Sequence, residues 1–243
     1  MGQARKKAYA DAEENLSILS VSAGLFSALK ERPGLYPALG LLSVLPAAIL
    51  QMVSISLNMD MDLAARFINM VFSALAGAAI ASAVFQPFME MGFFKALAQG
   101  FSSFRNLAIL AILINILTFA GTLLLFVPGA IVACMCFVAV PVCVAEGLSP
   151  ADSITRSISL SQGSWLKIFF FIVIYMLGII FLPKAGIWAG KALKADTAIE
   201  VLIVNLFMIL PNTFYGLASA LVYADLRLIR EGVSVEMLST EID

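Results

Sequence analysis

Six long runs of apolar residues, each almost free of charge, recur along this chain of 243 residues. One helix needs about 20 mainly apolar residues to cross the roughly 30 Å hydrocarbon core of a membrane. Charged residues make up only 13% of the sequence and hydrophobic residues 61%, whereas soluble domains average about 25% and about 45–50%. The sequence therefore predicts an all-α polytopic membrane protein, with no room for a separate soluble domain.

The apolar runs predict six transmembrane helices, at about 35–57, 64–88, 106–126, 129–145, 165–183 and 197–224. Neighbouring spans pair into three helical hairpins over about 35–88, 106–145 and 165–224. In the second hairpin, Val127-Pro128-Gly129 predicts a tight turn, because Pro-Gly pairs favour turns. Residues 1–34 are expected to form a cytoplasmic N-terminus with a first interfacial helix, and residues 225–243 a cytoplasmic tail. Residues 1–243 then form a single integral membrane domain.

A short amphipathic segment that ends in glycine precedes each hairpin and predicts a helix at the membrane interface. The three segments are 26–34, 94–100 and 157–163, and their glycines are separated by 66 and then 63 positions. They indicate either a parallel internal repeat or the common ending of short helices at glycine. The interfacial helix that contains the third segment has the clearest start, since Ser149-Pro150 before it supplies an N-cap serine and a proline at the first helical position.

Basic residues are unevenly divided between the two sets of connectors. Eleven fall on one side, namely Arg5, Lys6, Lys7, Lys30, Arg32, Lys95, Arg105, Arg156, Lys167, Arg227 and Arg230, and four on the other, namely Arg66, Lys184, Lys191 and Lys194. Cytoplasmic connectors carry the excess of Lys and Arg, so both termini are expected in the cytoplasm. The polar N-terminus does not favour a cleavable signal peptide, and the first span is expected to act as the insertion signal.

Several classes of chemistry are excluded or disfavoured by the residues present. Histidine is absent, which excludes histidine-dependent nucleophilic triads, histidine metal ligands and imidazole proton relays. There is no phosphate loop or dinucleotide fingerprint, and a net charge of −1 does not favour nucleic-acid binding. Cys134, Cys136 and Cys143 fall in one apolar run and are interpreted as buried thiols. We therefore expect no metal, no cofactor, no nucleic-acid partner and no enzymatic activity.

Charged residues cluster where the returning spans are expected to end. These candidate boundary charges are Glu90, Glu146, Arg156, Asp225 and Arg227. A carboxylate deep in lipid usually has a function, but one at the boundary can reach water. The charges are interpreted either as pairs that fix the register of the helices or as functional groups.

The sixth span carries the most polar set of residues within the membrane. Asn205, Asn212 and Ser219 are seven residues apart and share one helix face, which indicates either a polar cavity or hydrogen bonds between helices. In the second span, Ser73, Gly77 and Ala81 form a stripe of small residues that predicts close helix packing. A symmetric oligomer through this stripe is one hypothesis.

Three stretches carry a resemblance to a known family. They are Phe126-Val-Pro-Gly129, then Pro141-Val-Cys-Val-Ala-Glu-Gly-Leu-Ser-Pro150 with Ser153-Ile-Thr-Arg-Ser157 and Leu160-Ser-Gln-Gly163, and Tyr223-Ala-Asp-Leu-Arg227 with Arg230-Glu-Gly232. The chain resembles the membrane-domain family attached to some bacterial glycerophosphoryl diester phosphodiesterases, and the YciC-like inner-membrane proteins. The resemblance covers mainly residues 126–232. It implies six spans in a bacterial inner membrane but not the phosphodiesterase activity, which resides in a separate barrel domain of that family.

Two functions are compatible with these features. The first is a non-catalytic membrane module that interacts with lipids, organises the membrane or anchors a partner. Its expected partners are membrane lipids and either another protein or a second copy of the chain. The alternative is a small permease for a lipid or amphiphilic solute. A membrane enzyme is least favoured, since Glu146 or Asp225 would have to act as a base without histidine or metal ligands.

Overall fold

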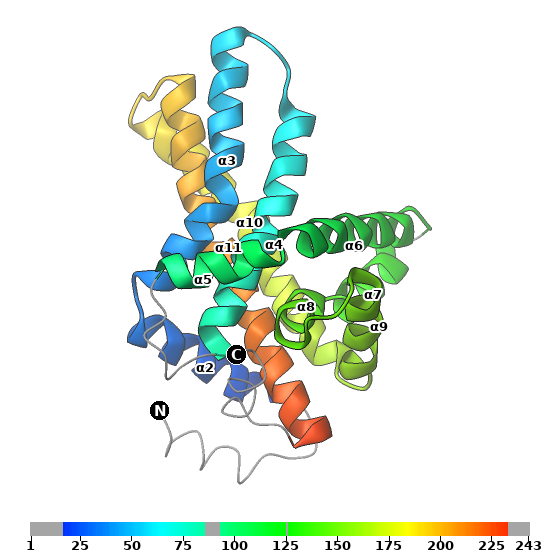
Figure 1. The fold of residues 1–243 in the computed structure, drawn as a ribbon. Coiled ribbons are helices and arrows are strands. Elements are labelled where there is room, and N and C mark those ends of the chain that lie inside the picture. The colour runs from blue at the N-terminus through cyan, green and yellow to red at the C-terminus, as the bar shows by residue number, and fades with distance from the viewer. Residues whose placement is uncertain (1–16, 86–92, 125, 233–243) are drawn as a thin grey trace.

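The computed structural model describes residues 17–85, 93–124 and 126–232. In these ranges all regular elements are helices, and six helical segments are long and apolar enough to cross a membrane (Figure 1). The helices are α2 (Ile18–Glu31), α3 (Leu35–Leu57), α4 (Asp62–Phe85), α5 (Phe93–Ser102), α6 (Phe104–Leu124), α7 (Phe126–Met135), α8 (Ala139–Glu146), α9 (Pro150–Ser161), α10 (Trp165–Ala192) and α11 (Thr197–Glu231). The chain is an all-α multi-pass membrane protein, as predicted.

A short helix precedes each pair of long helices. α2 precedes the hairpin of α3 and α4, α5 precedes that of α6 with α7 and α8, and α9 precedes that of α10 and α11. The hairpins diverge, because α3 and α4 point upward in Figure 1 while α6 and α7 extend to the right. The glycines of the suggested repeat have different conformations: Gly34 is the right-handed N-cap of α3, Gly100 lies inside α5, and Gly163 has a φ of 75°.

The last two helices run further than their predicted spans. α10 continues to Ala192 and α11 to Glu231, so the first residues of the predicted cytoplasmic tail are helical. Lys184 and Asp225 marked the predicted ends, because charges interrupt an apolar run. Neither residue ends its helix, since a lysine side chain can extend to water and Asp225 accepts a hydrogen bond from Ser20.

The fourth span is interrupted in its middle. α7 ends at Met135 and α8 begins at Ala139, with three residues in a turn between them. Pro141 lies in the first turn of α8, where its missing N–H group costs no helical hydrogen bond. The three cysteines around this interruption are buried free thiols.

The predicted Pro-Gly turn of the second hairpin is wrong in its position. Pro128 and Gly129 lie within the first turns of α7 and not in the connector before it. Proline is tolerated there for the same reason as in α8. Gly129 permits close contact with α6, because a Cβ atom at this position would overlap Oγ1 of Thr122.

The second half of α11 is the centre of the protein. Residues 216–227 are all buried, and α11 contacts α2, α4, α8 and α9 as well as its neighbours α3 and α10. Most of these residues are apolar or small, and a helix segment with few polar side chains is stable when other helices surround it. α3 approaches α11 closely at Gly40, where a Cβ atom would overlap Oγ1 of Thr213.

The small-residue stripe of α4 faces the interior. Ala81 is fully buried, and a Cβ atom at Gly216 of α11 would lie 3.5 Å from the Cα atom of Gly77. Ser73 lines an internal cavity. Gly77 of the stripe therefore lies against α11 of the same chain, and an oligomer through the stripe stays a prediction.

Candidate functional site

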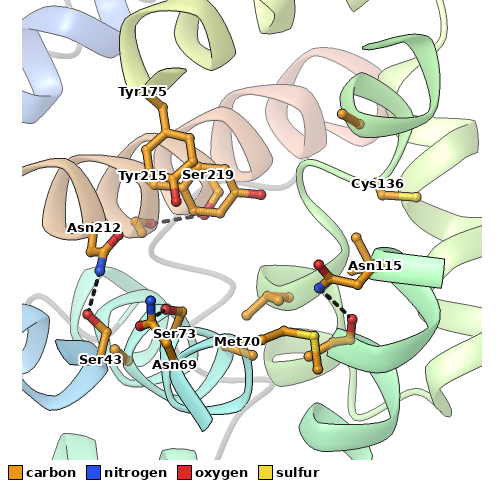
Figure 2. A pocket seen from close by; sticks show the side chains of 18 of the residues that line it. Ser43, Asn69, Met70, Ser73, Asn115, Cys136, Tyr175, Asn212, Tyr215 and Ser219 are labelled. Carbon is orange, nitrogen blue, oxygen red and sulfur yellow. Dashed lines mark hydrogen bonds between the residues drawn. The ribbon is translucent and has the colours of Figure 1, made fainter. Parts of the chain in front are cut away.

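A cavity of about 370 Å³ lies between the diverging hairpins, and we call it the central cavity. Residues of α3, α4, α6, α7, α8, α10 and α11 line it, so all three hairpins contribute. Its polar lining side chains are Ser43, Arg66, Asn69, Ser73, Asn115, Thr118, Tyr175, Asn212, Tyr215 and Ser219. Figure 2 shows most of them arranged around one central space, with apolar side chains such as Met70 between them.

Hydrogen bonds hold part of this polar lining in place. Asn212 Nδ2 donates to Ser43 Oγ at 2.8 Å, which joins α11 to α3 (Figure 2). Ser43 Oγ in turn donates to the carbonyl oxygen of Gly40 at 2.7 Å. The rings of Tyr175 and Tyr215 lie 4.7 Å apart between their centroids, at 46° to one another. The wall formed by α3, α10 and α11 is therefore well ordered by contacts between helices.

The predicted polar face of the sixth span divides between two cavities. Asn212 and Ser219 line the central cavity, whereas Asn205 lines a second cavity of about 420 Å³ between α3, α4, α10 and α11. Asn205 Nδ2 donates to Gln51 Oε1 at 3.1 Å and to the carbonyl oxygen of Val201 at 2.8 Å. Asn205 and Asn212 thus each line a cavity and each donate a hydrogen bond to a side chain of α3. A polar cavity and hydrogen bonds between helices are therefore compatible interpretations of this face.

Three of the predicted boundary charges meet where α8, α9 and α11 converge. Arg156 Nε lies 3.0 Å from Glu146 Oε2, and Arg227 Nη1 lies 3.3 Å from Glu146 Oε1. Tyr223 Oη donates to Glu146 Oε1 at 3.0 Å. Glu231 completes the set, since it pairs with Arg227 Nε at 2.6 Å and with Arg156 Nη2. We call these five residues the ion-pair network.

The network balances its own charge at a partly buried place. Two arginines face two glutamates, and the Arg227 side chain is only 8% exposed. A guanidinium with so little access to water needs carboxylate partners. Burial opposes the charge on Arg156, but the hydrogen bonds to Glu146 and Glu231 and the attraction of their negative charges together outweigh it and raise the pKa of Arg156. The ion-pair network therefore joins α8, α9 and α11, as expected if the boundary charges are pairs that fix the register of the helices.

The remaining boundary charges lie elsewhere. Asp225 faces α2, where Ser20 Oγ donates to its Oδ2 atom at 2.9 Å. Glu90 lies outside the described residues. Tyr223 and Glu231 of the network were not among the predicted site residues, although Tyr223, Arg227 and Glu231 are spaced by four residues and so share one helix face.

A further buried contact supports the interrupted fourth span. Ser157 of α9 is fully buried, and its Oγ donates to the carbonyl oxygen of Met135 at 2.6 Å. Met135 is the last residue of α7, so its carbonyl lies where the helical ladder of hydrogen bonds is broken. The predicted capping of α9 is confirmed, because Asp152 N donates to Ser149 Oγ. α9 therefore stabilises the interruption as well as the ion-pair network.

Comparisons with known proteins give no further identification. No family model matches the chain, and neither a curated protein nor a solved structure gives a match. The resemblance to the phosphodiesterase membrane-domain family stays a prediction. What the chain does must therefore be argued from the central cavity and the contacts around it.

Proposed function

We propose that this chain is a non-catalytic module of the bacterial inner membrane that binds a lipid or a similar amphiphile in the central cavity. Through this ligand it would organise the membrane or anchor a partner. The proposed orientation has both termini in the cytoplasm, which the distribution of basic residues supports. No cofactor and no nucleic acid belong to the proposal.

The observation that carries the proposal is the mixed lining of the cavity. Small-molecule sites are commonly about 300–1,000 Å³ in volume and combine apolar walls with a few polar groups. The central cavity, at about 370 Å³, has apolar walls together with amide and hydroxyl groups from three hairpins. An amphiphile satisfies both kinds of surface at once, whereas a purely apolar acyl chain would leave the polar groups without partners.

Native mass spectrometry of the protein released from mild detergent, with identification of the lipids it retains, tests this proposal. Ser73→Phe places a ring in the cavity, and Leu63→Phe adds a ring on the same helix at a side chain that is 83% exposed. We expect the wild-type protein and Leu63→Phe to retain a lipid, and Ser73→Phe to lose it. Equal retention by both variants, with unchanged melting temperatures, would contradict binding in this cavity.

The interrupted fourth span favours a permease as a second candidate. Broken helices at membrane depth occur where the backbone lines a cavity, and they are common at transporter binding sites. Here the break at residues 136–138 borders the central cavity through Cys136. If the chain moves an amphiphile, Asn212→Leu should abolish flux in proteoliposomes while the protein stays folded. Asn205→Ala tests whether the path includes the second cavity, and unchanged flux in both variants would exclude a path along this face.

A further inference from the structure

Arg66 is the one charged residue among the described residues that line the central cavity. It lies in the second turn of α4, near the loop that joins α3 to α4, and its side chain is exposed. Within the described part of the chain no carboxylate forms an ion pair with it. The cavity therefore presents a positive charge at one end without an internal counter-charge.

Amide groups on two facing helices add neutral hydrogen-bonding groups to the lining of the same cavity. Asn69 lies three residues after Arg66 on α4 and uses its Oδ1 atom to accept a hydrogen bond from Ser73 at 3.3 Å. This hydrogen bond uses the Oδ1 atom only, so the Nδ2 group of Asn69 can donate to a ligand in the cavity. Asn115 of α6 lines the same space, and one of its Nδ2 hydrogens is donated to the carbonyl oxygen of Ala111 at 2.9 Å. Figure 2 places Asn69 and Asn115 on facing walls.

We propose that the ligand of the central cavity carries an anionic phosphate group, which Arg66 binds together with the amide of Asn69. This inference rests on the proposed function and specifies the ligand class of the same site. A guanidinium is well suited to phosphate because its planar set of donors matches the phosphate oxygens. Arg66 therefore acts as the residue that selects the head group of the amphiphile.

The remainder of the cavity fits the uncharged parts of such a ligand. Ser73 lies two helical turns beyond Arg66, about 10 Å further along the axis of α4. Around this depth the polar groups are neutral, including Asn212 and the hydroxyl group of Tyr215. Neutral donors suit the ester carbonyls and hydroxyls that lie between a lipid phosphate and its acyl chains. The single charge of the lining, on the exposed Arg66, thus lies at the end of the cavity nearest the loop between α3 and α4, where a head group can reach water.

Displacement of a fluorescent-tailed phosphatidylglycerol from the purified protein in neutral detergent tests this proposal. The two competitors are unlabelled dioleoylphosphatidylglycerol and dioleoylglycerol, which share acyl chains and differ in the phosphate head group. We expect the phosphatidylglycerol to compete at least tenfold better with the wild-type protein. Arg66→Gln should weaken phosphatidylglycerol binding by about tenfold, which corresponds to about 1.4 kcal/mol, and leave dioleoylglycerol unchanged.

Lys191→Gln is the matched control, because Lys191 is an exposed basic residue that does not line the cavity. It lies on the same side of the membrane in the proposed orientation. The Lys191→Gln variant should bind phosphatidylglycerol with the same affinity as the wild-type protein. An equal loss in Lys191→Gln and Arg66→Gln would overturn the proposal in favour of general surface charge, and full preference retained in Arg66→Gln would overturn it directly.

Two further results separate failure of the head-group assignment from failure of the proposed function. If both competitors bind equally well and Ser73→Phe abolishes their binding, the cavity binds lipid but Arg66 does not select the head group. If Ser73→Phe leaves binding intact, the cavity is not the lipid site and both proposals fail. Displacement of the probe by inorganic phosphate alone would overturn the proposal that the ligand is an amphiphile, and would identify a free anion as the ligand.

Discussion

Arg227 Nη1 lies 3.3 Å from Glu146 Oε1, which joins the end of the last helix to the end of the interrupted fourth span. The two residues are 81 positions apart in the chain. Glu146 also accepts hydrogen bonds from Arg156 of α9 and from Tyr223. A single carboxylate therefore connects α8, α9 and α11 at the point where the second and third hairpins meet.

Replacing Glu146 by glutamine should destabilise the protein by about 2 kcal/mol, because two guanidinium groups then lose a charged acceptor in a partly buried place. Thermal unfolding in detergent, with the folded fraction at each temperature measured by size-exclusion chromatography, gives this loss. Glu31→Gln is the control, since Glu31 is exposed at the end of α2 and makes no ion pair with a described residue. Equal melting temperatures for the two variants would show that the network adds no stability.

The positions of the six spans could be predicted from the sequence because span length is set by the thickness of the membrane. α3 begins and ends at the predicted residues, Leu35 and Leu57. The end of α11 could not be predicted from hydropathy, because Asp225 and Arg227 are tolerated in a buried helix only through partners that are distant in the sequence. Hydropathy assigns the same penalty to a paired charge and to an unpaired one.

The candidate site was predictable only in part. Asn212 and Ser219 were identified as polar residues at membrane depth, but Arg66, Asn69 and Asn115 were not expected to join them. Their meeting depends on the angle between the α3–α4 and α6–α7 hairpins, which no short-range pattern in the sequence specifies. The one available signal was the spacing of Arg66, Asn69 and Ser73, which places all three on one face of α4.

Ser157→Ala should destabilise the protein by about 1–2 kcal/mol, since it removes the buried hydroxyl that donates to the carbonyl of Met135 at the break between α7 and α8. Ser159→Ala is a close control, because Ser159 is exposed and donates only to the carbonyl of Arg156 in its own helix. Melting temperatures of the two variants measure the difference. A Ser157→Ala protein as stable as Ser159→Ala would show that another group satisfies this carbonyl.

Gly163→Ala should cost about 1–2 kcal/mol, because residue 163 has a φ of 75° and alanine is strained in this left-handed region. The strain would fall on the connection between α9 and α10. Gly34→Ala is the comparison, since Gly34 has a right-handed backbone and a Cβ atom there would meet nothing within 4 Å. Alanine at residue 34 should be neutral or slightly stabilising through the unfolded state. Limited proteolysis and thermal unfolding of both variants check this contrast, and equal stability would argue against the left-handed conformation at residue 163.

The contact between α3 and α11 depends on the absence of a side chain at Gly40. A Cβ atom there would overlap Oγ1 of Thr213 and lie 3.2 Å from the carbonyl oxygen of Ile209. Gly40→Ala should therefore force the two helices apart and lower stability by about 1–3 kcal/mol, the usual cost of overpacking. The same displacement would move Ser43 away from Asn212 and disturb the wall of the central cavity.

A second substitution tests this cause directly. Thr213→Ala removes Oγ1, after which the nearest atom of residue 213 would lie 3.3 Å from the Cβ atom of Ala at residue 40. The double variant should recover a large part of the stability lost in Gly40→Ala, so that the two effects are not additive. Thermal unfolding of both single variants and the double variant completes the cycle. Additive losses would mean that α3 and α11 do not approach one another at these residues, and that the polar wall formed by Ser43 and Asn212 is assembled in another way.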